Sequence, residues 1–506
     1  MTEEHKLSAR VLYSKKEGDI RTRFQHDRDR ILYSKAFRRL SGKTQVFLTG
    51  LDDHRRTRLT HTLEVSQIAR TISGNLNLDV DLTEAIALGH DLGHTPFGHA
   101  GERVLNLFTS GCVGYKNFNI EDTLRYKFLA GFKHNWQSVR IVTDITTYND
   151  KRNGLDLSPE VVWGILHHSS TKYDKCKLRY YDGTEFLCTY RNINTKCDNE
   201  LSTSFYDLYS EYDNNKYFTF EAIVVGIADE IAQRHHDLED SLLSNLIEFI
   251  ECKNFFPQIK NYVDELNYLS EVVNQYITKT ISHFASILKS CSKFSLESLR
   301  VIPKKVEELR SELKLENYLP EDSKVHEFLK SRVLLAHETQ KMDGRAFFII
   351  QRIYKAYLSN PQQLPDLTIK QVFNNFNNIL GGNSQYSIKF RDRLKDKDLI
   401  LVDKILEGIN KIDEETKAKF LNFKSMIFLI PNRFDKNNKY DSYKRIDAAN
   451  NHEMSAYRKL LKETRLSENK PFAMILLRTI TDHIAGMTDR KAIETYQKLY
   501  AIDTLI

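Results

Sequence analysis

The sequence predicts an all-α protein. Only 9 of the 506 residues are proline and 20 are glycine, so long amphipathic stretches can run without helix breakers. Hydrophobic residues make up 41% and charged residues 28%, which is typical of a folded globular chain. The length is sufficient for a large core and for about two to four domains.

The charge balance and the N-terminal sequence exclude several protein classes. The 74 basic residues are nearly matched by 68 acidic ones, so the net charge of +6 does not indicate a dedicated nucleic-acid binder. The six cysteines include no CxxC pair, which favours reduced thiols over a zinc knuckle or a disulfide framework. The start "MTEEHKLSAR" has no apolar signal region, and no stretch approaches the ~18 apolar residues of a membrane span. We therefore expect a soluble cytoplasmic protein without membrane contact.

The predicted helices follow one another along the first half of the chain. The arginine-rich segment 20–60 is punctuated by apolar residues, so one of its faces is expected to be buried. His61 shares a buried stripe at helical spacing with the apolar residues of "LTHTLEVSQIARTI". Pro159 suits the start of another helix. The expected helices cover residues 59–72, 82–93, 132–142, 159–168 and 218–240.

Two larger regions complete the expected organisation. Residues 170–218 are rich in turn formers, as in "NINTKCDNE", and are expected to form a surface excursion. We divide the chain into a core over 1–240 and a helical C-terminal region over 241–506. The second region is expected to complete the wall of the site and to supply subunit contacts.

Four side chains on separate predicted helices suit a divalent metal ion. The segment "ALGHDLGHTPFGHAGE" contains the adjacent pair His90 and Asp91, while Asp229 follows the apolar run "EAIVVGIA" and should point inward. A buried carboxylate needs a compensating cation or dense hydrogen bonding. Together with His61 they form a mixed nitrogen and oxygen set without thiolate, which suits Mn²⁺, Fe²⁺, Co²⁺ or Mg²⁺.

The same segment contains a second pair, His99 and Glu102. Three positions apart, they face the same side of a helix, which suits an imidazole oriented by a carboxylate. A histidine titrates near neutrality and can act as a proton carrier without much tuning.

This H…HD…D arrangement resembles the HD-domain superfamily of helical, metal-dependent phosphohydrolases. Six segments in order are also similar to the deoxyguanosine triphosphate triphosphohydrolase family. They are "RDRILYSKAFRRLSGKTQVF", "RTRLTHTLEVSQIAR", "HDLGHTPFGHAGE", "FKHNWQSVRIV", "ADEIAQRHHDLED" and "DHIAGMTDRKA". The resemblance implies an HD-domain helical core with a largely helical C-terminal extension.

The resemblance also implies a reaction and assigns roles to residues. A deoxynucleoside triphosphate, dGTP or another, would be attacked at the α-phosphorus and split into deoxynucleoside and tripolyphosphate. Mn²⁺ or Mg²⁺, with Fe²⁺ or Co²⁺ as alternatives, would be held by the four side chains named above. His99 would carry the proton with Glu102 orienting it, and His134 would line the site.

Further residues correspond to substrate contacts in the family. Arg58 is the main expected phosphate contact, with Lys43 and Arg39 beside it, and Gln45 corresponds to a sugar or base contact. His94 is either a turn residue or a substrate contact. Gln233 stands where the family usually has tyrosine, which puts the substrate pose in doubt. The implied partners are a nucleotide effector, single-stranded DNA and further copies of the chain, commonly six.

Two other functions stay open on the sequence. His134 and His167 lie between the HD pair and Asp229, in the order that dinuclear HD phosphodiesterases or phosphatases use for a second metal. Alternatively, the basic segments 20–60 and 442–465 could hold nucleotides or nucleic acid in a regulatory module whose hydrolysis is incidental.

Overall fold

The computed structural model describes residues 19–45, 56–109, 131–149, 152–171, 209, 212, 214–259, 261–291, 295–381, 391, 394, 396–427, 453–464 and 470–500. Within these residues the regular structure is helical apart from one antiparallel hairpin, of strands β1 (Thr147–Asn149) and β2 (Arg152–Asn153), and an isolated bridge between Thr44 and Thr57. The prediction of an all-α protein is therefore confirmed. In the described part of the chain, no helix has an apolar stretch that could cross a bilayer.

The N-terminal core is formed by short and medium helices. They are α1 (Arg23–Leu32), α2 (Lys35–Arg39), η2 (Leu40–Gly42), α3 (Arg58–Asn75), α4 (Val80–Gly89), α5 (Gly98–Thr109), α7 (His134–Arg140), η3 (Ile141–Ile145), α8 (Pro159–His167), η7 (Asn215–Tyr217) and α10 (Phe220–Leu243). Local capping explains several of their starts. The Thr57 and Thr219 hydroxyls accept backbone N–H bonds at the starts of α3 and α10, and Pro159 occupies the first turn of α8, as predicted.

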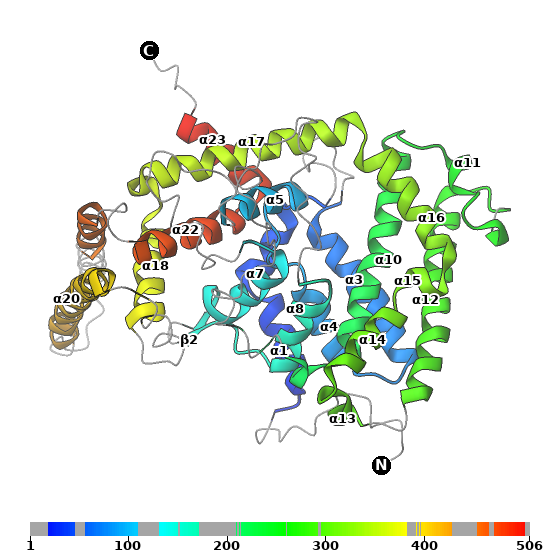
Figure 1. Cartoon of the computed structure of the whole chain (residues 1–506), viewed down its shortest axis with the longest axis horizontal. Helices are drawn as coiled ribbons and strands as arrows, with labels where there is room; N and C mark the ends of the chain where they lie inside the picture. Colours follow the sequence, from blue (N-terminus) through cyan, green and yellow to red (C-terminus); the bar gives the residue numbers. More distant parts are fainter. Residues whose placement is uncertain are drawn as a thin grey trace.

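The centre of this core is the contact between α3, α4 and α10, with α1 and α8 packed on α4 (Figure 1). The apolar stripe predicted for residues 59–72 is buried there, including Val65, Ile68 and Ile72. Trp163 on α8 is fully buried against the same core. Burial of these side chains fixes the rotation of α3 and α10, and so the direction in which their polar residues point.

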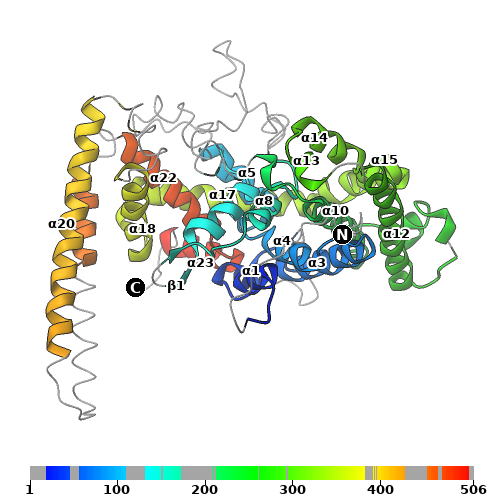
Figure 2. The ribbon, with the colours of Figure 1, turned by 90° about the horizontal axis from the view of Figure 1, so that it is seen from below.

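The C-terminal region adds helices around the core. They are α11 (Phe249–Cys252), η8 (Pro257–Ile259), α12 (Glu265–Cys291), α13 (Leu296–Arg300), α14 (Pro303–Glu312), α15 (Leu315–Tyr318), α16 (Pro320–Leu329), η9 (Lys330–Leu334), α17 (His337–Ser359), η10 (Pro361–Gln363), α18 (Asp366–Phe376), η11 (Asn377–Gly381), α20 (Asp396–Ile427), α22 (Lys470–Ala485) and α23 (Asp489–Tyr500). Helix α17 packs on α5, α22 and α23, which brings the end of the chain to the N-terminal core. Helix α20 stands at one edge of the molecule (Figure 2).

Three expectations from the sequence have different outcomes. The helix expected over 82–93 ends at Gly89, so His90 and Asp91 lie in the turn that follows it rather than on a helix. The turn-rich region 170–218 lies mostly outside the described residues, as does much of the basic segment 442–465. The boundary expected near residue 240 falls close to the end of α10, and the division into two regions stays a prediction.

Candidate active site

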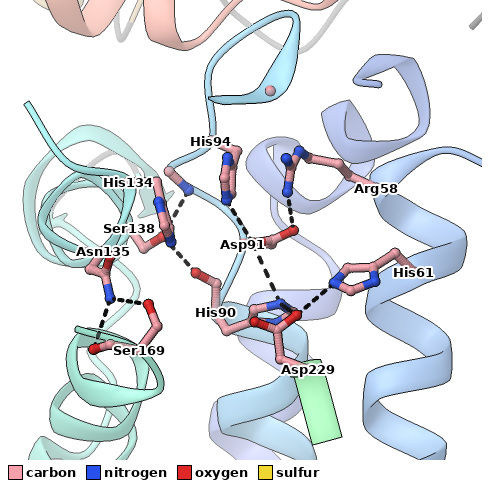
Figure 3. A network of polar contacts seen from close by, with 12 residues as sticks. Arg58, His61, His90, Asp91, His94, His134, Asn135, Ser138, Ser169 and Asp229 are labelled. Atoms are coloured by element: carbon pink, nitrogen blue, oxygen red, sulfur yellow. Dashed lines mark hydrogen bonds and ion pairs between the residues drawn. The ribbon is translucent and has the colours of Figure 1, made fainter. Parts of the chain in front are cut away.

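The turn after α4 carries His90 and Asp91 to His61 of α3 and Asp229 of α10, and so brings the predicted metal ligands together (Figure 3). His61 Nε2 lies 2.9 Å from Asp229 Oδ1, and His90 Nε2 lies 3.8 Å from the same oxygen. The ligand atoms of His61, His90 and Asp229 all lie within 4.8 Å of one another. This spacing suits a single ion bound between the three side chains.

His90 supplies the clearest sign that this cluster fits a metal ion. Its Nδ1 lies 2.6 Å from the Ala87 carbonyl oxygen, so this nitrogen carries the proton and Nε2 carries the lone pair. His90 Nε2 is buried and has no hydrogen-bond partner among the described residues. A buried, unpaired imidazole nitrogen facing a carboxylate is a typical metal donor.

Asp91 faces the cluster from the same turn but is also contacted by two histidines and one arginine. Its Oδ1 lies 3.5 Å from His90 Nε2 and 3.1 Å from His94 Nε2, and its Oδ2 accepts a 2.6 Å bond from Arg58 Nη1. Burial raises the pKa of Asp91, but His94, Arg58 and His90 outweigh burial and hold that pKa well below its usual value. The carboxylate is therefore ionised and available to a metal ion through Oδ1.

A second cluster adjoins the first and contains the three expected catalytic residues. Glu102 Oε2 lies 2.7 Å from His134 Nδ1 and 3.8 Å from His99 Nδ1, so one carboxylate serves two imidazoles. The His94 ring stacks on His134 with 3.9 Å between centroids. Burial raises the pKa of Glu102, but its contacts with His134 and His99 lower that pKa well below the usual value. The His99 side chain is 58% exposed, which leaves it open to a bound molecule.

His168 is a site residue that sequence reasoning missed. The ring of His167, the expected second-metal ligand, stacks on Trp163, and its Nδ1 contacts the Trp163 carbonyl. The buried neighbour His168 faces the site instead, with its ring centroid 5.1 Å from that of His90. Burial lowers the pKa of His168 to about 3, so the ring is neutral at pH 7. The adjacent histidines at the end of α8 left the choice open in the sequence.

The loop between the two clusters is held by close backbone packing. Gly93 N–H donates to Ser138 Oγ, and that hydroxyl donates to the His90 carbonyl. A Cβ on Gly93 would lie 2.1 Å from the His134 carbonyl oxygen, so no larger residue fits there. Two successive residues, Phe97 and Gly98, adopt left-handed φ values of 61° and 57° just before His99. Their conformation sets the direction in which α5 leaves the loop.

The C-terminal segment anchors this loop from the other side. Asp489, at the start of α23, accepts a 2.8 Å bond from Phe97 N–H, a 2.9 Å bond from Thr44 N–H and a further bond from the Thr44 hydroxyl. Lys43 Nζ donates to the carbonyls of His94 and Ala485. Lys43 is an expected phosphate contact. Within this structure its amine joins the loop to α22, and burial lowers its pKa to about 7.

The remaining expected substrate contacts surround the clusters. Arg58 is buried beside Asp91, and a Cβ on Gly98 would lie 3.2 Å from its Nη2. Arg39 is partly buried, its pKa is lowered by burial, and it makes no hydrogen bond or ion pair with a described residue. Gln45 Oε1 is buried without a partner in the same described set. Gln233 lies partly buried on α10, one turn after Asp229. Their roles as substrate contacts stay predictions.

Comparison with known proteins places the chain in a family. Residues 58–234 match a family model described as the HD domain, and residues 449–498 match one described as a phosphohydrolase-associated domain. Among the relatives, the deoxyguanosinetriphosphate triphosphohydrolase-like protein of Bartonella tribocorum is 34% identical, over 70% of this chain and 82% of its own. Proteins of the same name from Rickettsia felis and Rickettsia prowazekii are each 33% identical, over 70% and 74% of this chain and 84% and 88% of their own. The chain belongs to this family.

Membership in the deoxyguanosinetriphosphate triphosphohydrolase-like family identifies the chain as an HD-domain hydrolase. All four predicted metal ligands lie within the residues matched to the HD domain, and the clustered His and Asp side chains suit a divalent ion. Asp489 lies within the residues matched to the phosphohydrolase-associated domain. The two matched segments therefore meet at the loop that leads into α5, the helix of His99 and Glu102.

Proposed function

We propose that the protein hydrolyses a deoxynucleoside triphosphate, dGTP or another, to deoxynucleoside and tripolyphosphate. The observation that carries this proposal is the adjacency of two clusters. The first, His61, His90 and Asp229 with Asp91 beside it, suits a divalent ion. The second joins His94, His99, Glu102 and His134 through one carboxylate and stacked rings. A metal site next to an oriented, exposed imidazole is the combination that phosphate-ester hydrolysis needs.

The metal would be held by His61, His90, Asp91 and Asp229, with Mn²⁺ or Mg²⁺ favoured by the mixed nitrogen and oxygen set and Fe²⁺ or Co²⁺ as alternatives. When bound, the ion would polarise an α-phosphate oxygen and lower the pKa of the attacking water. Arg58 keeps Asp91 ionised and oriented in the absence of substrate. The Arg58 side chain can then exchange its contact with Asp91 for a phosphate oxygen.

His99 is the residue that we assign to proton transfer. Its exposure allows contact with the reacting oxygen atoms, and Glu102 lies on the Nδ1 side of the ring. The carboxylate stabilises the protonated imidazole and leaves Nε2 directed away from Glu102. His134 shares the carboxylate and packs on His94, so it limits the positions that the Glu102 side chain can adopt.

Cations near the clusters support a polyphosphate substrate. Arg39 and Arg58 are close enough to Lys43 to lower its pKa, after burial itself and against the smaller opposite effect of Asp489 and Asp91, so three basic side chains lie near one another. Arg39 makes no ion pair within the described residues. A triphosphate would supply the missing negative charge. Gln45 and Gln233 would contact the sugar or base.

The family resemblance extends the proposal to partners. A second nucleotide acting as an effector, single-stranded DNA, and assembly of several copies of the chain, such as a hexamer, are included as proposals. Each has a direct readout: activation in nucleotide mixtures, salt-sensitive DNA binding, and mass in solution. DNA binding that survives loss of Asp91 would favour a regulatory role over hydrolysis as the main function.

The test is an incubation of the protein with each of the four deoxynucleoside triphosphates, singly and in pairs, with Mn²⁺ or Mg²⁺. Anion-exchange chromatography separates tripolyphosphate, pyrophosphate and phosphate. Tripolyphosphate with free deoxynucleoside is expected, and Asp91→Ala serves as the inactive control. Release of phosphate, or of pyrophosphate with the deoxynucleoside monophosphate, would refute cleavage of the bond between the α-phosphorus and the 5′-oxygen. A metal content of two ions per chain would favour the dinuclear phosphodiesterase or phosphatase.

A further inference from the structure

The two imidazoles of the metal cluster are held in different ways. His90 is oriented by the Ala87 carbonyl of its own helical turn. No such carbonyl contact is found for His61 among the described residues, where its Nδ1 lies 3.2 Å from Nδ1 of a third histidine, His236 on α10. His236 is fully buried, and none of the catalytic roles proposed above uses it. This contact places a second imidazole directly behind a metal ligand.

His236 is the first member of a chain of polar contacts that leads to the surface. Its Nε2 bonds to the Glu64 carboxylate, which lies one helical turn after His61 on α3. Glu64 also accepts a 3.1 Å bond from Arg56 Nε, and Arg56 pairs in turn with Glu239 and with Asp240. Glu64 is therefore held on two sides, and its carboxylate is fixed against His236.

The direction of these hydrogen bonds follows from the chemistry of the groups. The His236 ring lies between the Glu64 carboxylate and Nδ1 of His61, and in its neutral form it carries one N–H. An ionised carboxylate only accepts, so that N–H is on Nε2 and donates to Glu64. His236 Nδ1 then carries a lone pair and must accept from His61 Nδ1–H. The proton of His61 is thereby placed on Nδ1, and the lone pair of Nε2 points at Asp229 and His90.

We propose that Glu64 and His236 are positioning residues that fix the tautomer and the ring orientation of His61 for metal binding. The inference rests on the proposed function only through the metal ion. A metal-bound histidine is commonly held by a carboxylate or carbonyl on its other nitrogen. In this protein the carboxylate acts through an intervening imidazole, because Glu64 reaches His236 and His236 reaches His61.

A separate ion at Glu64, His235 and His236 is the rival explanation of the same residues. Their ligand atoms also lie within 4.8 Å of one another, with His235 Nδ1 3.5 Å from Glu64 Oε2. The Arg56 guanidinium beside Glu64 opposes a second cation there. His235 therefore separates the two explanations, because only the rival requires its ring.

The experiment measures Mn²⁺ affinity and stoichiometry by electron paramagnetic resonance of free Mn²⁺, on the full chain. Glu64→Leu and His236→Phe remove the contacts and are expected to weaken binding by about 10- to 100-fold. Glu64→Gln removes the charge but keeps an accepting oxygen, and His236→Asn places an oxygen near the Nδ1 position. Both should stay within about threefold of the wild-type affinity. His235→Gln should leave affinity and stoichiometry unchanged.

The outcomes separate the possible failures. The midpoint of thermal unfolding in EDTA should be similar for Glu64→Leu and Glu64→Gln, because Glu64 is partly exposed. If Glu64 had a purely structural role, its loss would lower this midpoint together with the Mn²⁺ affinity. If wild type binds no Mn²⁺, and calorimetric titration finds no binding of Mg²⁺, Fe²⁺ or Co²⁺ either, the proposed function fails. If wild type binds and Glu64→Leu binds equally tightly, the positioning role is refuted. If wild type binds two ions and His235→Gln binds one, a second metal site at Glu64, His235 and His236 would replace the positioning role as the explanation. The comparison of Glu64→Leu with Glu64→Gln tests the positioning role even if His236→Phe does not fold.

Discussion

Asp489 joins the last helix to the loop before α5, and its replacement by asparagine tests whether the C-terminal region positions the catalytic residues. The carboxylate is 3% exposed and accepts bonds from Phe97 N–H, Thr44 N–H and the Thr44 hydroxyl. Asparagine has nearly the same shape but only one accepting oxygen. Its NH₂ group must therefore face either the Phe97 N–H or the Thr44 donors.

The expected loss follows from the number of bonds. A hydrogen bond to a charged group contributes about 1.5–3 kcal/mol, and a buried donor left without a partner costs about 1–3 kcal/mol. Asp489→Asn loses one or two such bonds, so we expect the free energy of unfolding to fall by about 2–4 kcal/mol. Phe97 would also be freed from its left-handed φ of 61°. A shift of about 1 Å in the loop that leads to His99 would lower kcat by about 100-fold.

The assay combines urea unfolding in EDTA with steady-state hydrolysis and Mn²⁺ affinity, all well below the unfolding transition. Asp27→Asn is the matched control, because Asp27 is 2% exposed and accepts from the backbone N–H and hydroxyl of Ser158 without contacting the catalytic loop. Asp27→Asn should be less stable than wild type but keep its kcat. Asp489→Asn should lose both stability and kcat, and keep its Mn²⁺ affinity. An unchanged kcat in Asp489→Asn, or an equal fall of kcat in Asp489→Asn and Asp27→Asn, would refute the role of Asp489 in positioning the catalytic residues.

Three other predictions concern single residues. His99→Ala should lower kcat by about 100-fold or more while Mn²⁺ affinity stays constant, and an unchanged rate would remove its role in proton transfer. Asp91→Ala should abolish both Mn²⁺ binding and turnover, because it removes a charged ligand and leaves buried Arg58 unpaired, and tight binding by this variant would exclude Asp91 as a ligand. Lys43→Met tests a pH dependence. The native pKa of Lys43, about 7, lies below its unfolded value of about 10.4, so the native state binds fewer protons between these values. Between pH 7 and about pH 9 the stability of wild type relative to Lys43→Met should therefore rise, by up to about 1.4 kcal/mol per pH unit in urea unfolding. A pH-independent difference would mean that Lys43 stays charged.

The helices of the core could be predicted from hydrophobic periodicity, because this periodicity depends only on residues close together in the chain. The apolar stripe of 59–72 places His61 in the interior, and the run before Asp229 directs that carboxylate toward the site, where its side chain stays 24% exposed. Burial of an ionisable group then requires compensation, so a metal cluster could be expected before the helices were placed. The helix limit was less predictable. His90 lies beyond the end of α4, because its ring engages the Ala87 carbonyl and the chain turns at Gly93 to meet α7.

By itself, therefore, the sequence determined the helical class, the family resemblance and the residue types of the site. Only the tertiary structure showed that His168, and not the expected His167, faces the site, because the two residues at the end of α8 point in different directions and the His167 ring packs on Trp163. It also decided that Asp489 holds Phe97 and that Glu64 reaches His61 through His236. These contacts join residues on different helices. Which of these residues meet is determined by the packing of whole helices, and this packing cannot be predicted from local spacing in the chain.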